Sequence, residues 1–483
     1  MVAIGLSDVT FNSLQFAGFF IVAFIVYWAL RRPSPQNIFL VVASYAFYAW
    51  FDWRFMFLLA GTTIVDFFAV QRIFVAGDNE RRRRAWMIAS VAVNLGVLGF
   101  FKYCGFFVQS GVSLANKLGL HLTDPLIRFT LPVGISFYVF HEISYAIDVY
   151  RRRCEPEYNL ATYAVYIAFF PQLVAGPITR AAHMLPQFRR QREFPDRESI
   201  YSAFVLIVSG LFKKVVLADG VVRIVNKVFE KPDHRGALPL MIAAVAFSIQ
   251  IYGDFAGYTD IARGVARLLG IDLARNFEQP YLSRNITQFW RTWHISLSSW
   301  LSDYLYVPLG GNRGSNLLTY RNLLVTMLLG GLWHGASWHF VVWGGLNGLA
   351  LIAHRMRGGT AARGPAPRVG TSDIPAIFGN FVLVTIFWVF FRAKSLGDAL
   401  HFFSAMRAGI LGSRPGAWWP SLILVTMFST ILFTMDIIDR NRRVWRPLTT
   451  WPAWRQGALA GAAIVAIVIF SGGAPTPFIY FQF

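Results

Sequence analysis

Long apolar runs alternate with short basic ones along most of the chain. The first run, Leu14–Leu30, is about long enough to cross a hydrocarbon core of ~30 Å as a helix. The region Ile38–Val75 is interrupted at Asp52–Arg54 and predicts a helical hairpin. Further apolar runs follow at Trp86–Phe107, Leu131–Tyr150, Tyr201–Val216, Leu238–Tyr252, Leu323–Ala353, Ile377–Phe391, Leu422–Met435 and Gly457–Phe470. The pattern predicts one all-α domain, 1–483, a polytopic transmembrane helical bundle with about ten crossings.

Three segments do not read as crossings. Leu160–Ile178 is apolar but contains Pro171 and Pro177, and basic loops flank it on both sides, so we expect a re-entrant loop. Asn276–Tyr320 is too polar to span and predicts half-inserted amphipathic helices. The linker Arg355–Ser372 is basic and rich in Gly and Pro, which predicts a cytoplasmic loop.

Composition and charge support a membrane location. The chain is 55% hydrophobic and 14% charged, whereas a soluble protein carries about a quarter charged residues. The net charge of +20 comes from short basic clusters between apolar runs, which favours membrane topology over nucleic-acid binding. With those clusters in the cytoplasm, both termini and the weakly basic loop Gln109–Arg128 lie outside the inner membrane. The apolar N-terminal run lacks a preceding basic region, so we expect no cleaved signal peptide.

His334 is the sharpest candidate for chemistry because ionisable groups are rare at membrane depth. It lies in an apolar stretch, and burial would keep its imidazole neutral and able to accept a hydroxyl proton. The small residues Gly331, Gly335 and Ala336 would leave room for a substrate beside the ring. A packing histidine that bonds to a carbonyl of a neighbouring helix explains the same pattern.

His294 is a second candidate, from the half-inserted region. It could line a cytoplasmic mouth while His334 lies deeper, or it could be an interfacial histidine beside anchoring tryptophans. Asp254 and Asp260 could neutralise a buried arginine such as Arg263 or Arg284, a structural use that we favour over proton chemistry.

Other classes of site lack their usual marks. No two of these ionisable groups have a tight metal-ligand spacing, so we predict no metal site. The sequence has no Walker-type phosphate loop and no G-x-S-x-G elbow, and its two cysteines, Cys104 and Cys154, form no disulfide framework. Acyl transfer to a hydroxyl needs none of these, since a positioned base and exclusion of water suffice.

Several motifs in the right order resemble the membrane-bound O-acyltransferase family, in its bacterial branch that serves polysaccharide O-acetylation. The matching stretches are Phe169–Ile178, Gln250–Asp260, Phe289–Ser298, Asp303–Gly311 and Arg321–Gly344, and the closing Pro477–Phe483 is similar to the polysaccharide-acetylating members. The resemblance implies a ring of helices around a central channel, with the invariant family histidine at His334 and the second histidine at His294.

The resemblance also implies substrates and partners. The membrane subunit would take acetyl from a cytoplasmic donor, expected to be acetyl-CoA, and pass it to a periplasmic SGNH or esterase-type acetyltransferase that modifies a polysaccharide such as alginate. No bound cofactor is implied, and membrane lipid surrounds the chain. Close relatives with nearly the same motifs serve cellulose, peptidoglycan and other glycans, and the branch that D-alanylates teichoic acid shares the histidine pair. These acceptors therefore stay open. A lipid transporter and a scaffold are the alternatives outside enzymes.

The proposed mechanism assigns the remaining candidates. We expect Arg284, Arg291 and Arg313 to meet the donor's phosphates, although solvated arginines are the plainer alternative. Trp333 and Trp338 would hold the His334 ring and exclude water. Asn322 and Asp254 join them as channel-lining candidates.

Overall fold

The computed structural model describes residues 10–123, 129–174, 176–232, 236–359, 366–409, 418–442, 451–472 and 476–481. These residues form helices and no strand, which confirms the predicted all-α class. They are arranged in two compact units, one made of residues 1–203 and 262–274 and the other of 204–261 and 275–483. The units are not separate along the sequence, because two long helices contribute to both.

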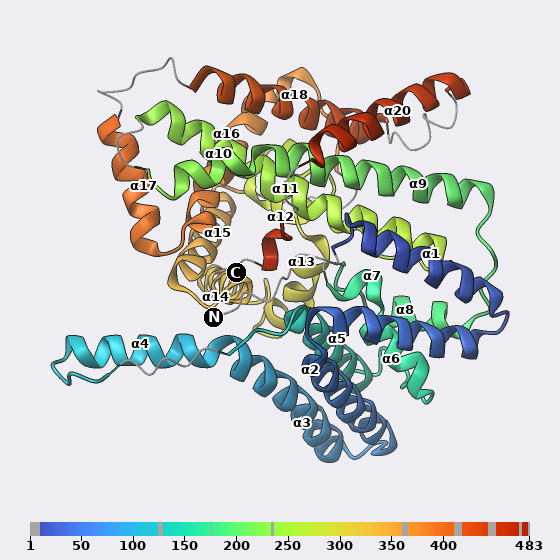
Figure 1. The fold of residues 1–483 in the computed structure, drawn as a ribbon. Helices are drawn as coiled ribbons and strands as arrows, with labels where there is room; N and C mark the ends of the chain where they lie inside the picture. The colour runs from blue at the N-terminus through green and yellow to red at the C-terminus, as the bar shows by residue number, and fades with distance from the viewer. Residues whose placement is uncertain are drawn as a thin grey trace. The chain divides into compact units, whose positions relative to one another are not determined.

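The first unit contains the N-terminal helices (Figure 1). They are α1 Leu14–Ala29, α2 Pro33–Val75, α3 Glu80–Leu98, η1 Gly99–Tyr103, α4 Cys104–Lys117, α5 Ile135–Tyr150, α6 Leu160–Ala168, α7 Phe170–Leu173 and α8 Ala181–Arg189. Asp66 of α2 accepts hydrogen bonds from Ser90 of α3 and Tyr163 of α6, and all three are buried. This polar contact fixes the three helices in register, since a buried carboxylate must be hydrogen-bonded.

Two features of this unit agree with the sequence patterns. α2 breaks at Asp52, whose backbone is non-helical (φ −163°, ψ 112°), at the interruption that predicted a hairpin. The apolar run Leu160–Ile178 is divided at Phe169 into α6 and α7, and at ~1.5 Å per residue neither reaches across a hydrocarbon core. Re-entry into a membrane stays a prediction, and residue 175 lies outside the described part.

One expectation about this unit is wrong. The crossing predicted at Trp86–Phe107 lies within the apolar helical segment Glu80–Lys117. The loop predicted at Gln109–Arg128 begins too early, because the helix continues to Lys117. The π-helix η1 carries the helix past Gly99, and the weakly polar sequence Val108–Lys117 contains no proline that would end it. Residues 124–128 of the predicted loop lie outside the described residues.

The second unit contains most of the motifs that carry the family resemblance. Its elements are η2 Phe212–Ala218, α10 Asp219–Phe229, η3 Pro280–Leu282, α12 Ile286–Thr292, α13 Ile295–Leu301, η4 Ser302–Tyr306, α14 Asn316–His334, α15 Trp338–Met356, η5 Thr371–Asp373, α16 Ile374–Arg392, α17 Leu396–Gly409, α18 Trp419–Arg442, α20 Ala453–Phe470 and η7 Ile479–Phe481. α9 Arg197–Leu211 and α11 Ala237–Leu268 belong to both units.

The region Asn276–Tyr320 behaves as its polarity predicted. α12 and α13 have seven residues each, so each rises only about 10 Å and cannot span a membrane. Insertion to half depth stays a prediction. Of the predicted cytoplasmic linker, residues 360–365 lie outside the described part, and α15 continues to Met356 before it.

Seven helices in the described residues are long and apolar enough to cross a membrane. They are Pro33–Val75, Glu80–Lys117, Arg197–Phe229, Ala237–Leu268, Thr371–Arg392, Trp419–Asn441 and Ala453–Phe470. With the two shorter apolar segments Leu14–Ala29 and Leu160–Leu173, they confirm a polytopic membrane protein. The count of about ten crossings stays a prediction.

Glycines bring α14 and α15 into close contact. A Cβ on Gly331 would lie 2.2 Å from the carbonyl oxygen of Phe340, and one on Gly344 would lie 2.2 Å from the carbonyl oxygen of Met327. A Cβ on Gly335 would lie 2.1 Å from the Phe340 ring. The expectation that Gly331 and Gly335 leave room for a substrate is therefore wrong, because α15 already fills that space.

Gly331→Ala should destabilise the protein by about 1–3 kcal/mol, because the added methyl group meets backbone that cannot move without parting the two helices. Gly345→Ala is the matched control on α15, since its Cβ meets only the end of the Leu328 side chain at 3.3 Å. Thermal unfolding in detergent measures both. Equal melting temperatures for the two variants would contradict this account of the contact.

Candidate active site

His334 is the last residue of α14 and is only 4% exposed. Four aromatic side chains surround its ring: the ring centroids of Trp333, Trp343, Phe391 and Tyr480 lie 5.0, 5.1, 5.3 and 5.6 Å away. The end of the helix thus presents an imidazole to an enclosure of aromatic rings. Such surroundings exclude water from the ring.

His294 lies between α12 and α13 and is fully buried. Its backbone is left-handed (φ 43°, ψ 54°), a conformation that costs most L-residues about 1–2 kcal/mol. Flanking backbone hydrogen bonds hold it there: Ile295 N–H donates to the carbonyl oxygen of Asn276, and Glu278 N–H donates to that of Thr292. Strain of this kind persists only where the surroundings impose it, and it concentrates at functional sites.

The His294 ring is packed against Phe255, with centroids 4.7 Å apart. Within the described residues neither ring nitrogen has a hydrogen-bond partner. Burial lowers the pKa of His294 to about 3, so the ring is neutral at physiological pH and has one nitrogen available to accept a proton or a hydrogen bond.

Two aromatic side chains join the histidines. Tyr480 packs on His294 with nearly parallel rings at 6.5 Å and on His334 at 5.6 Å, and Trp333 lies 6.0 Å from His294 and 5.0 Å from His334. The structure therefore brings the two predicted histidines into one enclosure. α11, α14, α16 and the segment before α13 all contribute a ring to it.

Tyr480 is a site residue that the sequence analysis missed. It comes from η7 near the C-terminus, which Figure 1 shows in red among the helices of the second unit. Its hydroxyl is buried and has no hydrogen-bond partner among the described residues, and burial raises its pKa above the usual value of a phenol. In the sequence, the C-terminal segment Pro477–Phe483 contributed only to the family resemblance. A single tyrosine in an aromatic segment has no motif or spacing that marks it as a site residue.

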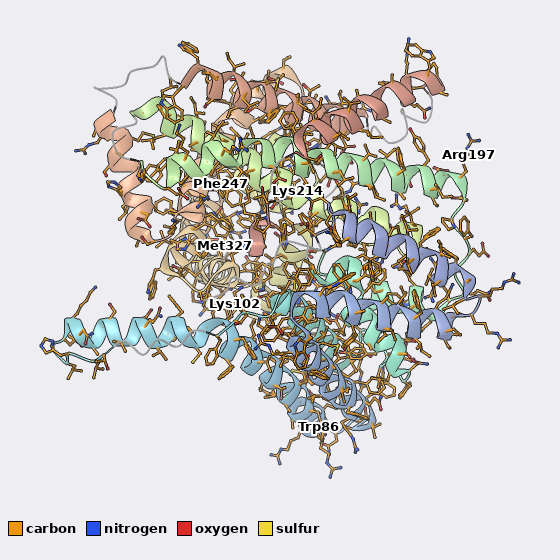
Figure 2. All side chains as sticks on the ribbon, in the orientation of Figure 1. Trp86, Lys102, Arg197, Lys214, Phe247 and Met327 are labelled. Atoms are coloured by element: carbon orange, nitrogen blue, oxygen red, sulfur yellow. The ribbon has the colours of Figure 1, made fainter. Side chains whose placement is uncertain are left out.

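A buried ion pair anchors this tail. Asp254 of α11 accepts a hydrogen bond of 2.6 Å from the backbone N–H of Ile479 and forms a 2.6 Å ion pair with Lys214. Lys214, labelled in Figure 2, also contacts Asp219 at 2.9 Å and donates to the carbonyl oxygen of Thr476 at 3.0 Å. Asp254 thus fixes the residue that precedes Tyr480.

Both aspartates pair with lysines, and the expected role of Arg284 needs correction. Asp254 pairs with Lys214, and Asp260 pairs with Lys213 at 2.7 Å. Arg284 forms its ion pair with Asp373 at 2.8 Å, because η5 places that carboxylate beside it. The sequence analysis named arginines, whereas the adjacent lysines of η2 face α11 and reach its carboxylates.

The other predicted arginines separate into two places. Arg291 and Arg313 line a cleft of about 930 Å³, together with Arg355, which the sequence analysis did not select. Arg284 is not among its lining residues, and one of its N–H groups donates to the carbonyl oxygen of Arg368. Asn322 is buried beside the cleft, where it donates to the carbonyl oxygen of Gly311.

Of the two predicted tryptophans, only Trp333 packs on the His334 ring. Trp338 is 55% exposed, and its shielding of the site stays a prediction. The tryptophan of α15 that contacts the ring is Trp343, more than a turn farther along. The reason is the close approach of Gly331 to Phe340 and Gly344, which sets that part of α15, and not its first residue, opposite His334.

The arrangement suits proton transfer from a hydroxyl. A buried imidazole enclosed by aromatic rings can take the proton of an attacking alcohol, and a second buried imidazole and a phenol lie beside it. No group of three His, Cys, Asp or Glu side chains within the described ranges could hold a metal ion.

The buried neutral state of His294 predicts a dependence of stability on pH. Its pKa rises from about 3 in the folded chain to about 6.5 in the unfolded chain, so the unfolded state binds an extra proton as the pH falls below 6.5. This group should remove about 2 kcal/mol of stability by pH ~5. Thermal unfolding of wild type and His294→Asn should show a smaller acid-induced loss in the variant, and equal losses would contradict the assignment.

Comparison with known proteins identifies the class. The profile of the membrane-bound O-acyltransferase family matches residues 132–396, which include both histidines, and the chain belongs to this family. It is therefore an O-acyltransferase with several membrane-spanning helices.

Three relatives extend this result. The chain is 41% identical to the probable alginate O-acetylase AlgI of Pseudomonas aeruginosa, over 82% of this chain and 74% of that one. It is 34% identical to the same-named protein of Pseudomonas putida, over 98% and 100% of the two chains. It is also 35% identical to a peptidoglycan O-acetyltransferase of Helicobacter pylori, over 82% and 79%.

Proposed function

We propose that this protein takes an acetyl group from a cytoplasmic thioester, acetyl-CoA, and delivers it for O-acetylation of an extracytoplasmic polysaccharide. The observation that carries the proposal is the shared enclosure of His294 and His334, two buried imidazoles against the same tyrosine and tryptophan. A general base shielded from water suits transfer to an alcohol and disfavours hydrolysis of the thioester.

In the proposed reaction the acceptor hydroxyl oxygen attacks the thioester carbonyl carbon. The new C–O bond forms, the C–S bond breaks, and the thiol leaves. His334 takes the hydroxyl proton and returns a proton to the thiolate, so no external acid or base is consumed. His294 lines the route to the carbonyl. Trp333 and Trp343 hold the His334 ring in place.

We infer an inner-membrane location with both termini outside, because the basic clusters between the apolar runs then lie in the cytoplasm. Apart from the half-inserted region Asn276–Tyr320, the chain has no long polar region between its apolar runs that could fold around a polymer. A periplasmic transferase of the SGNH or esterase type is therefore the proposed receiver of the acetyl group.

Alginate is the polymer that we propose first, because two of the most similar relatives are named for alginate O-acetylation. Peptidoglycan is the second candidate, since one relative is named for it. D-alanyl transfer to teichoic acid would require an aminoacyl thioester instead of acetyl-CoA.

Reconstitution in liposomes tests the proposal. Labelled acetyl-CoA is supplied on one side, alginate or peptidoglycan fragments on the other, with and without a soluble esterase-type transferase. We expect label in the polymer only when both proteins are present. Labelled polymer in the absence of the companion protein would rule out the need for a partner. If acetyl-CoA gives no transfer but a D-alanyl carrier thioester does, the donor assignment is wrong.

A further inference from the structure

Both backbone hydrogen bonds that flank His294 come from one short segment, residues 276–279. This segment ends at Gln279, whose backbone is also left-handed (φ 43°, ψ 63°). Within the described part of the chain, four non-glycine residues have positive φ, and Gln279 and His294 are two of them. Because such a conformation persists only where the surroundings impose it, the segment needs a support of its own before it can hold His294.

Arg440 supplies this support from the C-terminal end of α18. Its Nη2 donates to the carbonyl oxygens of Glu278 and Gln279 at 2.7 and 2.8 Å, and its Nε donates to the side-chain oxygen of Gln279 at 3.1 Å. Arg440 is buried, so water competes little for these hydrogen bonds. A planar guanidinium holds its acceptors in one fixed geometry, and it therefore fixes the end of segment 276–279 as a unit.

Two carboxylates on the same face of α18 reinforce the contact. Asp439 accepts a hydrogen bond from the side-chain amide of Gln279, and the buried Asp436 accepts one from the Tyr252 hydroxyl at 3.1 Å. The Tyr252 ring in turn packs on Trp293, the residue before the histidine, with centroids 6.1 Å apart. Ionisable side chains are costly in a helix that is apolar enough to span a membrane, yet α18 places three of them on this side.

We propose that Arg440 is a positioning residue for acyl transfer: through segment 276–279 it fixes the backbone of His294 and so the place of the imidazole beside His334. This inference rests on the proposed function. It adds a residue that lies beyond residues 132–396, the part of the chain that the family profile matches. Arg440 does not touch the reacting atoms, but a displacement of about 1 Å from the productive geometry can lower a rate by about a hundredfold.

A double-mutant cycle with labelled acetyl-CoA tests the link to His294. Arg440→Met removes the hydrogen bonds to segment 276–279, whereas Arg440→Lys keeps the charge but cannot reproduce the planar contact. We expect turnover to fall about tenfold or more in Arg440→Met and by less in Arg440→Lys. In a His294→Asn background the Arg440→Met change should cost less than about twofold, because the imidazole that it positions is already absent. Losses that multiply in the double variant would overturn the proposal.

The reaction of each histidine with diethyl pyrocarbonate, measured by mass spectrometry, gives a second readout that needs no activity. His294 should be protected in the wild type and modified about tenfold faster in Arg440→Met, because loss of the hydrogen bonds makes local opening easier. Arg192→Met is the matched control in the first unit. Arg192 is equally buried and also donates to backbone carbonyl oxygens, among them that of Phe188, so its loss should lower the melting temperature but leave His294 protected.

The modification assay decides the proposal even where turnover does not. If folded Arg440→Met protein protects His294 as the wild type does, Arg440 does not position the histidine. If Arg440→Met does not fold, Arg440→Lys takes its place: wild-type turnover and protection contradict the positioning role, and loss of both supports it. Because the assay involves no acetyl transfer, a wild-type protein that cannot use acetyl-CoA would count against the proposed function alone.

Discussion

His334→Ala should lower acetyl transfer by about 10²–10⁴-fold, the range that general-base catalysis contributes, and should leave donor affinity nearly unchanged. The reason is that the imidazole receives its proton only as the hydroxyl attacks, so the interaction belongs to the transition state. Steady-state kinetics with labelled acetyl-CoA should show a fall in kcat with little change in KM.

His401→Ala provides the control for the loss of a histidine. His401 is exposed on α17 and is not one of the residues whose rings surround His334. It should transfer acetyl as wild type does. If His334→Ala transfers at the wild-type rate while folding normally, His334 is a packing residue and the catalytic assignment is wrong. Loss of folding would be detected by size-exclusion profile and melting temperature.

Asp254→Ala should destabilise the protein by about 1–3 kcal/mol, because the buried Lys214 loses the nearer of its two carboxylates and keeps only Asp219 at 2.9 Å. It also removes the acceptor for the Ile479 N–H, so the tail that carries Tyr480 should detach from α11. Thermal unfolding and limited proteolysis of the C-terminal segment measure the two effects, and transfer should fall with them.

Asp272→Ala is the matched control for this change. Its ion pair with Arg267 at 3.1 Å is at the surface, where the Asp272 side chain is 61% exposed, and such pairs contribute less than about 1 kcal/mol. The account is wrong if the Asp254→Ala and Asp272→Ala variants have the same melting temperature and the C-terminal tail of Asp254→Ala resists protease. The ion pair would then not hold the site together.

The sequence predicted the helices well where apolar length decides the structure. α1, α16 and α20 follow the runs Leu14–Leu30, Ile377–Phe391 and Gly457–Phe470 closely, because a run of apolar side chains both forms a helix and excludes alternatives in a membrane. The extension of α4 to Lys117 was not predicted. The fall in hydropathy after Phe107 marks the end of an apolar surface, but it does not itself end the helix, which continues as α4.

The site was predicted in part for a similar reason. His334 and His294 stand out in sequence because their residue types are rare in apolar surroundings. Their shared neighbour Tyr480 lies far along the chain, and tyrosine in an aromatic tail is not unusual, so nothing local marks it. Trp343, and not the predicted Trp338, contacts His334 because of how closely α14 and α15 approach each other. Glycines on both helices set that approach.

The left-handed backbone of His294 creates a conflict between stability and activity at this position, because the residue that the proposed reaction needs is not the one that best fits the backbone. Asparagine adopts this conformation more readily than histidine, so replacement there could relieve strain that the surrounding hydrogen bonds now impose. A library screened only for survival of heating would then enrich variants that have lost the imidazole. Engineering of this enzyme for durability should therefore hold His294 fixed and seek its gains on surfaces far from α12 and α13.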